Sequence, residues 1–436
     1  MLLNLNKDQK LINELIQEFN KRKTIADKQY NYYIGKTDAY RNYEVNEDRC
    51  NRKVNDNFIK TFIDEEVSFM VGQPITYVSK SNNKQCIDDI YANLNNPSAT
   101  LDLDLATNLL IFGEAYELKY LDESEIKIKT YNPKTSIGYV NEENKVELFI
   151  RFYKKMLDDT IYMDIIDDKF IYKCTENNYI APYQTIEHYF GKCPVGYCCI
   201  ESTLYNDIKT LQDAYEYTMN DWTNEIGDTR LAYMVFSGCD LTPEQAKEMK
   251  RMGIIQLPNE KSNAQYLIKN LNSDFLRAYR DIVKEDIYRV SQHIDNQTQI
   301  QSNTSGTMLQ TRMNCLRLKI LSQNQALKDC LKDRIKCLFK YLNITENKDY
   351  DISDIQIEMQ LNLPKNDVET AQIMSQLNGK LSIRTGLSKL SFVTNADEEF
   401  NKMLEESKMI AENEEPKVDL DMVGEEDEVN QEPTTI

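Results

Sequence analysis

The stretch STLYNDIKTLQDAYEYTMNDWTNEIG, residues 202–227, indicates the fold class of this 436-residue chain. Its large apolar side chains recur every three or four residues, at Leu204, Ile208, Leu211, Tyr215, Met219, Trp222 and Ile226. This spacing gathers them on one side of an α-helix. At 1.5 Å per residue, the helix would be a rod of about 35 Å.

A second rod is predicted at 272–295 and a third helix at 307–342. The apolar positions of the second rod are Phe275, Tyr279, Ile282, Val283, Ile287, Val290 and Ile294. The insertion between the first two rods contains strand-like runs at 230–238 and 254–258. Between those runs, Thr242 is expected to cap a helix with Pro243 at its first position and Gln245 at its third.

The part of the chain before residue 202 combines helices and strands. Residues 1–30 have a helical pattern, with Leu11, Ile12, Leu15 and Phe19 on one side. A helix beginning near Phe58 should end before Gly72, a short β-type run follows at 75–79, and a helix near 97–110 should end at Gly113. From Glu114 to about Ile200 the apolar period becomes two, which predicts an antiparallel meander. The expected class is therefore α+β, mainly helical.

The totals exclude several classes of protein. A formal net charge of −19 argues against a surface that grips DNA or anionic lipid throughout, although DNA could still pass through such a protein. No apolar run approaches the roughly 20 residues that span a bilayer, and charges interrupt the N-terminal pattern, unlike a signal peptide. We therefore expect no membrane partner and synthesis in a cytoplasm, where the ten cysteines would be free thiols.

Enzymatic chemistry finds little support in the motifs. The chain has no GxxxxGK[ST] loop and no GxGxxG after a strand, and it has only two histidines. His293 lies at the edge of the second rod's apolar stripe, where a helix-surface role is favoured. A metal-dependent nuclease that uses scattered carboxylates is the enzymatic alternative. We predict no enzyme activity and no cofactor.

A zinc site is one hypothesis for GKCPVGYCC, residues 191–199, with His188 just upstream. Zinc sites use pairs such as CxxC, and Cys193, Cys198 and Cys199 do not match that spacing. Adjacent residues in a strand also point to opposite faces. Buried apolar thiols are the favoured interpretation, and no metal is expected.

Two polar features accompany the second rod. Arg277, Arg280 and Lys284 fall on one helix face, either as a basic stripe beside a polyanion or as an ion-paired face near Asp281 and Glu285. Residues 296–311 then carry no charge at all, in a chain with 28% charged residues.

The tail, from about residue 411, has ten acidic residues against Lys417 and is expected to be disordered.

Four stretches, in this order, resemble phage portal proteins. DEEVSFMVGQPITY (64–77) is similar to the helix-then-GxP signature near the family's start, and the segment 193–221 is similar to its PV motif followed by a long helix. SGTMLQTRMNCLRLKILSQNQALKD (305–329) resembles the SG-x-A-L start of a long helix, with Met308 in place of a small residue. Residues 362–406 resemble the family's closing stretch.

This resemblance implies a ring, usually of twelve subunits, at one vertex of the capsid of a tailed double-stranded-DNA phage. DNA would enter and leave through its centre. The implied partners are the terminase large subunit, a head-completion or adaptor protein, and the major capsid and scaffolding proteins. The protein would belong to the virion and would occupy the host cytoplasm during assembly. An acidic adaptor or scaffold that forms no ring is the alternative.

The resemblance also implies a division of the chain into the parts of a portal subunit. They are an N-terminal helical arm at 1–29, a wing at 30–201, stem helices at 202–228 and 272–295, a clip at 229–271, a tunnel loop at 296–306, a long wing helix at 307–342, a crown at 343–410 and an acidic tail at 411–436. In the tunnel loop, DNA would meet weak hydrogen-bonding groups. The residues expected to face it are Gln297, Gln299, Ile300, Gln301, Asn303, Ser305 and Gly306.

Overall fold

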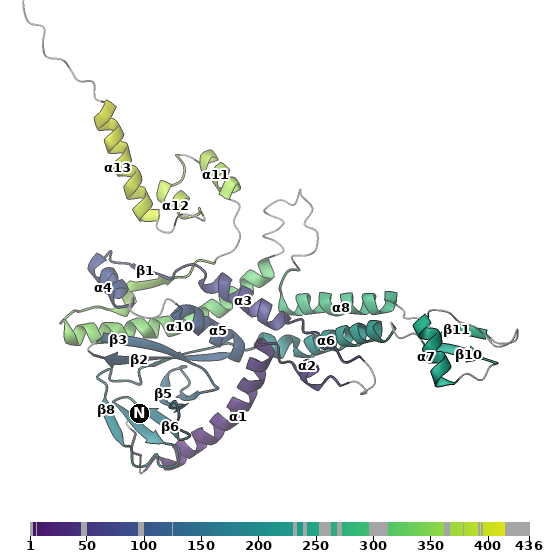
Figure 1. Cartoon of the computed structure of the whole chain (residues 1–436). Helices are drawn as coiled ribbons and strands as arrows, with labels where there is room; N and C mark the ends of the chain where they lie inside the picture. The colour runs from purple at the N-terminus through teal and green to yellow at the C-terminus, as the bar shows by residue number, and fades with distance from the viewer. Residues whose placement is uncertain are drawn as a thin grey trace, which may run out of the picture. The chain divides into compact units, whose positions relative to one another are not determined.

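Two compact units, Met1–Leu363 and Pro364–Ile436, divide the chain in a computed structural model. The structure describes residues 3–5, 7–44, 50–94, 100–123, 125–229, 233–238, 242–252, 263–267, 273–295, 313–361, 367–377, 379–390, 393 and 396–414 (Figure 1). The larger unit combines runs of helices with an uninterrupted run of strands from residue 114 to 199, and its paired strands are antiparallel, which confirms the expected α+β class.

The predicted single meander is two sheets. A five-stranded antiparallel sheet follows chain order, with strands β4 (Ser136–Val140), β5 (Val146–Lys154), β6 (Ile161–Ile166), β7 (Phe170–Thr175) and β8 (Gln184–Glu187). A separate three-stranded sheet has the order β3-β2-β9, formed by β2 (Glu114–Asp122), β3 (Glu125–Tyr131) and β9 (Val195–Cys199). The sheets separate because β2 pairs with β9, which follows the whole meander in sequence.

The N-terminal helix α1 (Gln9–Tyr33) is part of the larger unit's core. Its first half buries Ile12, Leu15 and Phe19 against the five-stranded sheet, where the Phe19 ring stacks on Phe152 with centroids 4.2 Å apart. Its second half contributes Tyr32 to the main core. The predicted apolar face is confirmed, and the division that sets residues 1–29 apart as an N-terminal helical arm stays a prediction.

Most of the main core lies among four helices: α3 (Phe58–Val71), α4 (Lys84–Leu94), α5 (Leu101–Phe112) and α10 (Asn314–Thr345). Helix α5 ends at Gly113, which has a φ of 80° and donates its N–H to Leu109 O. Glycine adopts this left-handed conformation without the steric cost of a Cβ, so the predicted helix end is confirmed.

The segment after α10 belongs to the larger unit. Strand β12 (Ile355–Glu358), preceded by the short 3₁₀ helix η1 (Ile352–Asp354), pairs with β1 (Thr76–Ser79). The hydrogen bonds of β12 thus hold residues 355–358 against β1, and the expected crown boundary at residue 343 stays a prediction. The second unit begins at Pro364.

Two helices form the predicted rods and lie side by side (Figure 1). They are α6 (Leu204–Thr229) and α8 (Ser273–Ser291). The insertion between them contains β10 (Tyr233–Ser237), α7 (Pro243–Met252) and β11 (Asn263–Leu267), and the two strands pair antiparallel. The predicted strand at 254–258 lies outside the described residues, and β11 was not predicted.

The predicted cap of α7 is present as a reciprocal pair of hydrogen bonds. Thr242 N donates to Gln245 Oε1 over 3.1 Å, and Gln245 N donates to Thr242 Oγ1 over 3.4 Å. These two bonds satisfy backbone donors that the first helical turn leaves without a partner.

The second unit contains α11 (Asp367–Gln376), α12 (Ile383–Leu387) and α13 (Ala396–Glu414). Leu387 is buried, and Arg384 lies over the Phe400 ring and pairs with Asp397. Residues 411–414 continue α13, so the predicted disordered tail begins too early; residues 415–436 lie outside the described part. Within the described residues, no helix is long and apolar enough to cross a membrane.

Candidate functional site

Helices α6 and α8 pack together through an aromatic contact that α3 completes. Phe58, the first residue of α3, meets the Tyr215 ring of α6 edge-on at 5.1 Å and the Tyr288 ring of α8 at 6.0 Å. Val283 and Ile287 of α8 are buried in the same core. Because one ring contacts both rods, α3 fixes the rod pair to the rest of the larger unit.

A neighbouring side of α6 is covered by an extended segment, residues 50–58. Buried amides of α6, spaced four or eight residues apart, hydrogen-bond to every second residue of this segment. Asn224 bonds to Arg52 N and O, Asn220 accepts from Val54 N, and Gln212 bonds to Asp56 O and Phe58 N.

The spacing explains why the two elements match. Four residues of helix rise about 6.0 Å, and two residues of extended chain rise about 6.6 Å. Each turn of α6 can therefore serve one residue pair of the segment. The sequence analysis missed this contact, although the buried polar series Gln212, Glu216, Asn220 and Asn224 carries the signal.

The apolar positions predicted for α8 divide between two faces. Val283 and Ile287 face the core, whereas Tyr279, Ile282 and Val290 are 42%, 59% and 38% exposed, and Phe275 is also exposed. Spacings of three, four and eight residues place these exposed side chains on one face of the helix. We call Tyr279, Ile282 and Val290 the outward face of α8.

The predicted basic stripe is mostly neutralised. Arg280 bonds to Asp281 and lies over the Trp222 ring of α6, 5.6 Å from its centroid. Lys284 forms an ion pair with Asp295 over 2.8 Å. Arg277 is exposed. Of the two predicted alternatives, ion pairing therefore describes Arg280 and Lys284.

All the predicted tunnel-loop residues, Gln297 to Gly306, lie outside the described residues, as does the start of the long helix predicted from 307. The described chain resumes at Met313, and α10 begins at Asn314. His293, just before the gap, is buried rather than on a helix surface. That prediction was wrong because the chain turns inward after α8 ends at Ser291.

Two of the three predicted thiols are buried, as expected. Cys193 Sγ donates to Ile166 O and Cys198 Sγ donates to Ala115 O, while Cys199 on the opposite face is half-buried. His188 is buried and its Nε2 lies 2.8 Å from Asp167 O. Among the residues that the structure describes, no group of three or more His, Cys, Asp or Glu side chains could hold a metal ion.

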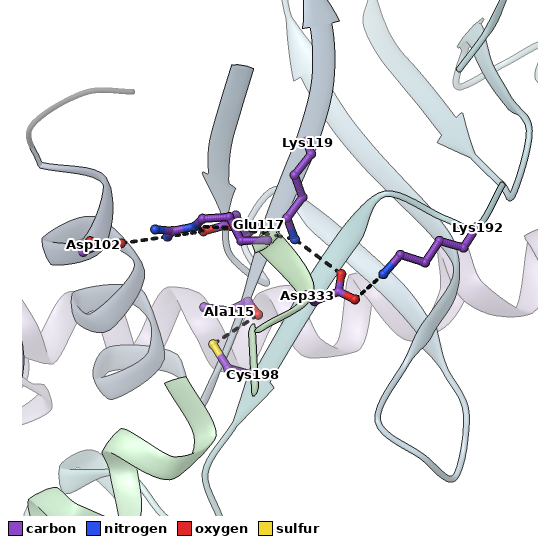
Figure 2. Close-up of polar contacts among 8 residues, drawn as sticks. Asp102, Ala115, Glu117, Lys119, Lys192, Cys198 and Asp333 are labelled. Atoms are coloured by element: carbon purple, nitrogen blue, oxygen red, sulfur yellow. Dashed lines mark hydrogen bonds and ion pairs between the residues drawn. The ribbon is translucent and has the colours of Figure 1, made fainter. Parts of the chain in front are cut away.

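A buried ion network joins α10 to the three-stranded sheet (Figure 2). Glu117 of β2 accepts from Arg334 Nε of α10 over 3.1 Å, and Arg334 Nη2 also donates to Asp102 over 2.7 Å. Lys119 Nζ lies 3.4 Å from Glu117 and 3.5 Å from Asp333, and Asp333 also binds Lys192. Glu117, Lys119 and Arg334 are almost completely buried.

The residues of this network stabilise one another in their charged forms. Burial alone would raise the pKa of Glu117, but the nearby charges of Arg334 and Lys119 outweigh it and hold the pKa below its ordinary value. Gly196 of β9 leaves the necessary room, because a Cβ there would lie 2.6 Å from Lys119 Nζ and 2.8 Å from Cys330 Sγ. The long helix is thus locked to the sheet by paired charges.

A groove of about 1070 Å³ opens beside the network, at Lys192 and Asp333. Its wall contains five lysines and five carboxylates: Lys145, Lys192, Lys332, Lys336, Lys340, Glu143, Glu147, Asp168, Asp329 and Asp333. This balanced lining selects neither anions nor cations.

The chain matches a known family over nearly its whole length. Residues 12–413 match the family model "Phage portal protein, SPP1 Gp6-like". The chain belongs to this family of phage portal proteins. It is therefore a portal protein of the capsid vertex in a phage-like virion, where portals assemble as rings. The family is a structural one.

Two solved structures are more weakly similar to this portal. A chain from the neck of an empty gene transfer agent particle, computed with C6 symmetry, is 12% identical, with 74% of this chain and 86% of that chain covered and a TM-score of 0.49. A chain from the neck of the native particle, computed with C12 symmetry, is 12% identical, with 77% and 91% covered and a TM-score of 0.45. No curated protein matches. The family assignment rests on the family model.

Proposed function

We propose that neighbouring copies of this portal pack against the outward face of α8, and that this contact closes the ring. The observation that carries the proposal is the exposure of Tyr279, Ile282 and Val290 along one face of a rod whose other face is already packed on α6. Contiguous apolar surface of this kind marks a protein contact.

The geometry of the rod pair favours a closed ring over a dimer. Residues 50–58 already cover one side of α6, and in the proposed ring the outward face of α8 meets a different surface of the next copy. Such a head-to-tail contact repeats around an axis and ends when the ring closes. Twelve subunits is the expected number.

Double-stranded DNA passes through this ring during packaging and ejection, with residues 296–306 as its contact. Support comes from charge. The chain is acidic, and Arg280 and Lys284 are already paired within the subunit. Firm phosphate contacts would slow a moving duplex, because each one releases counterions on binding. Amides and hydroxyls form weaker, exchangeable bonds.

The portal works without catalysing a reaction. Packaging is driven by ATP hydrolysis in a separate terminase, whose large subunit docks on the ring, and head-completion or adaptor proteins replace it afterwards. The clip, residues 229–271, offers the docking surface at the end of the rods. The major capsid and scaffolding proteins surround the ring in the virion, after assembly in the host cytoplasm.

The ring contact is tested by Ile282→Asp, which places a charge in the outward face of α8. Mass photometry and negative-stain electron microscopy should show that the purified wild-type chain forms rings and that Ile282→Asp remains monomeric. Glu285→Ala, at an exposed polar position of the same helix, is the matched control and should form rings. Normal rings from Ile282→Asp would refute the proposed contact.

A further inference from the structure

A buried polar cluster lies where α8 ends and α10 begins. It joins Glu66 of α3, His293 beyond α8, and Lys319 and Gln323 of α10. We call these four residues the flank anchor. Glu66 lies in the stretch 64–77, Lys319 and Gln323 lie in the stretch 305–329, and the fold brings them together with His293.

The imidazole ring of His293 is held in the flank anchor by stacking and by its Nδ1 atom. The imidazole stacks on Phe62 of α3, with centroids 4.1 Å apart and planes 14° apart. Its Nδ1 lies 3.0 Å from Ser291 O, an acceptor, so Nδ1 carries the hydrogen. Nε2 then carries none and lies 3.5 Å from Glu66 Oε1 without a hydrogen bond. The imidazole side chain has no exposure to solvent.

The backbone at this point is also constrained. Gln292 has a φ of 64°, a left-handed conformation that residues other than glycine rarely adopt. His293 N donates to Tyr288 O over 3.1 Å, which closes the end of α8. A strained residue persists only where its surroundings fix it, and the buried ring of His293 supplies that fixation.

Lys319 connects the two sides. Its Nζ lies 2.8 Å from Glu66 Oε1 and donates to Ser291 O, the last residue of α8, over 3.2 Å. One turn further along α10, Gln323 Nε2 donates to Glu66 Oε2 over 2.7 Å. Lys319 therefore ties the beginning of α10 directly to the end of α8.

The contact between Lys319 and Ser291 O is significant because the chain between α8 and α10 is long. Residues 296–312 number seventeen, and an extended chain of that length reaches roughly 55 Å. The chain connection alone therefore leaves the spacing of the flanks nearly free. The contacts of the flank anchor hold the end of α8 and the beginning of α10 within hydrogen-bond distance of each other.

We propose that Glu66, His293 and Lys319 are positioning residues that fix where the segment 296–312 leaves α8 and re-enters α10. In a ring, this would bring the segment from every copy to the same height and radius. The inference rests on the proposed function, in which residues 296–306 contact DNA.

The test separates positioning from stability. Lys319→Met leaves Glu66 as an unpaired buried charge, whereas the double variant Glu66→Gln/Lys319→Met replaces the ion pair by neutral groups of similar size. Such replacements often restore stability, but the double variant still lacks the tie from Lys319 to Ser291 O. Lys336→Met, at an exposed lysine of α10, is the matched control.

Three measurements are made on the assembled full-length chain: denaturant stability, hydrogen exchange at residues 289–295 and 313–323, and DNA packaged per capsid in the cognate system. The double variant should recover most of the stability lost in Lys319→Met. Its flank amides should still exchange about tenfold faster than wild type, and packaging should stay about tenfold below wild type. Lys336→Met should match wild type in all three.

Wild-type exchange at the flanks of the double variant would overturn the proposal, and so would packaging that recovers together with stability. Failure of the proposed function gives a different pattern. In that case, substitutions within 296–306 would leave packaging normal, while the anchor variants would still show faster exchange at the flanks.

Discussion

Glu117→Gln removes one charge from the buried network and changes almost nothing in side-chain shape. In the wild-type chain, the Glu117 carboxylate accepts from Arg334 and lies 3.4 Å from Lys119 Nζ. The variant therefore leaves two buried cations with one carboxylate fewer. Losing one partner of a buried pair costs about 3–5 kcal/mol.

The structure places this variant at the lower end of that range. Arg334 keeps Asp102 at 2.7 Å and Lys119 keeps Asp333 at 3.5 Å, so neither cation is left alone. The expected loss is about 3 kcal/mol, roughly a hundredfold change in the unfolding equilibrium. Urea unfolding of the unassembled subunit, followed by circular dichroism, measures it.

The pH dependence provides a second test. Because the folded-state pKa of Glu117 is lowered, its contribution to stability is complete above its ordinary pKa of 4.5 and is lost as pH falls through the folded value. The difference between wild type and variant should therefore shrink in acid. Glu143→Gln, in an exposed pair with Lys145, is the control and should match wild type. Equal midpoints for wild type and Glu117→Gln at pH 7 would refute the reasoning.

Three further predictions concern the rods and their flanks. Asn224→Leu should remove both backbone partners of Arg52, cost about 2 kcal/mol and accelerate hydrogen exchange of the Arg52 amide; an unchanged rate would contradict the amide ladder. Burial lowers the pKa of His293 to about 3, so below pH 6.5 the unfolded chain binds a proton that the folded chain excludes. The free energy of unfolding of wild type should therefore fall by about 1.4 kcal/mol per pH unit from pH 6 to 4, relative to His293→Gln. The comparison isolates His293 from Glu66, whose raised pKa acts in the opposite direction; a difference independent of pH would exclude a neutral buried imidazole. Gln299→Lys and Gln301→Glu should leave rings intact on electron microscopy and reduce packaged DNA, and normal packaging by both would reject the DNA contact.

Sequence patterns identified the elements that local chemistry determines. The end of α5 at Gly113 and the cap of α7 at Thr242 depend on a few neighbouring residues. The same holds for the period of α6, whose apolar residues lie on one helix side. These features could be predicted because the residues that cause them are close in sequence.

Contacts between distant segments could not be found in this way. Strand β1 pairs with β12, almost 280 residues later, and neither carries a signal for the other. Glu117 and Arg334 resemble ordinary surface charges until the fold buries them together. The apolar period of α8 was visible, but periodicity cannot distinguish Val283, which packs inside the subunit, from Ile282, which is exposed.

The most direct test of the account is an electron-microscopy reconstruction of the assembled wild-type chain, resolved well enough to place side chains on α8. The account predicts a closed ring of about twelve copies, with Tyr279 and Ile282 buried against the next subunit. A closed ring in which both side chains face solvent, or a failure to form rings at any concentration, would contradict it.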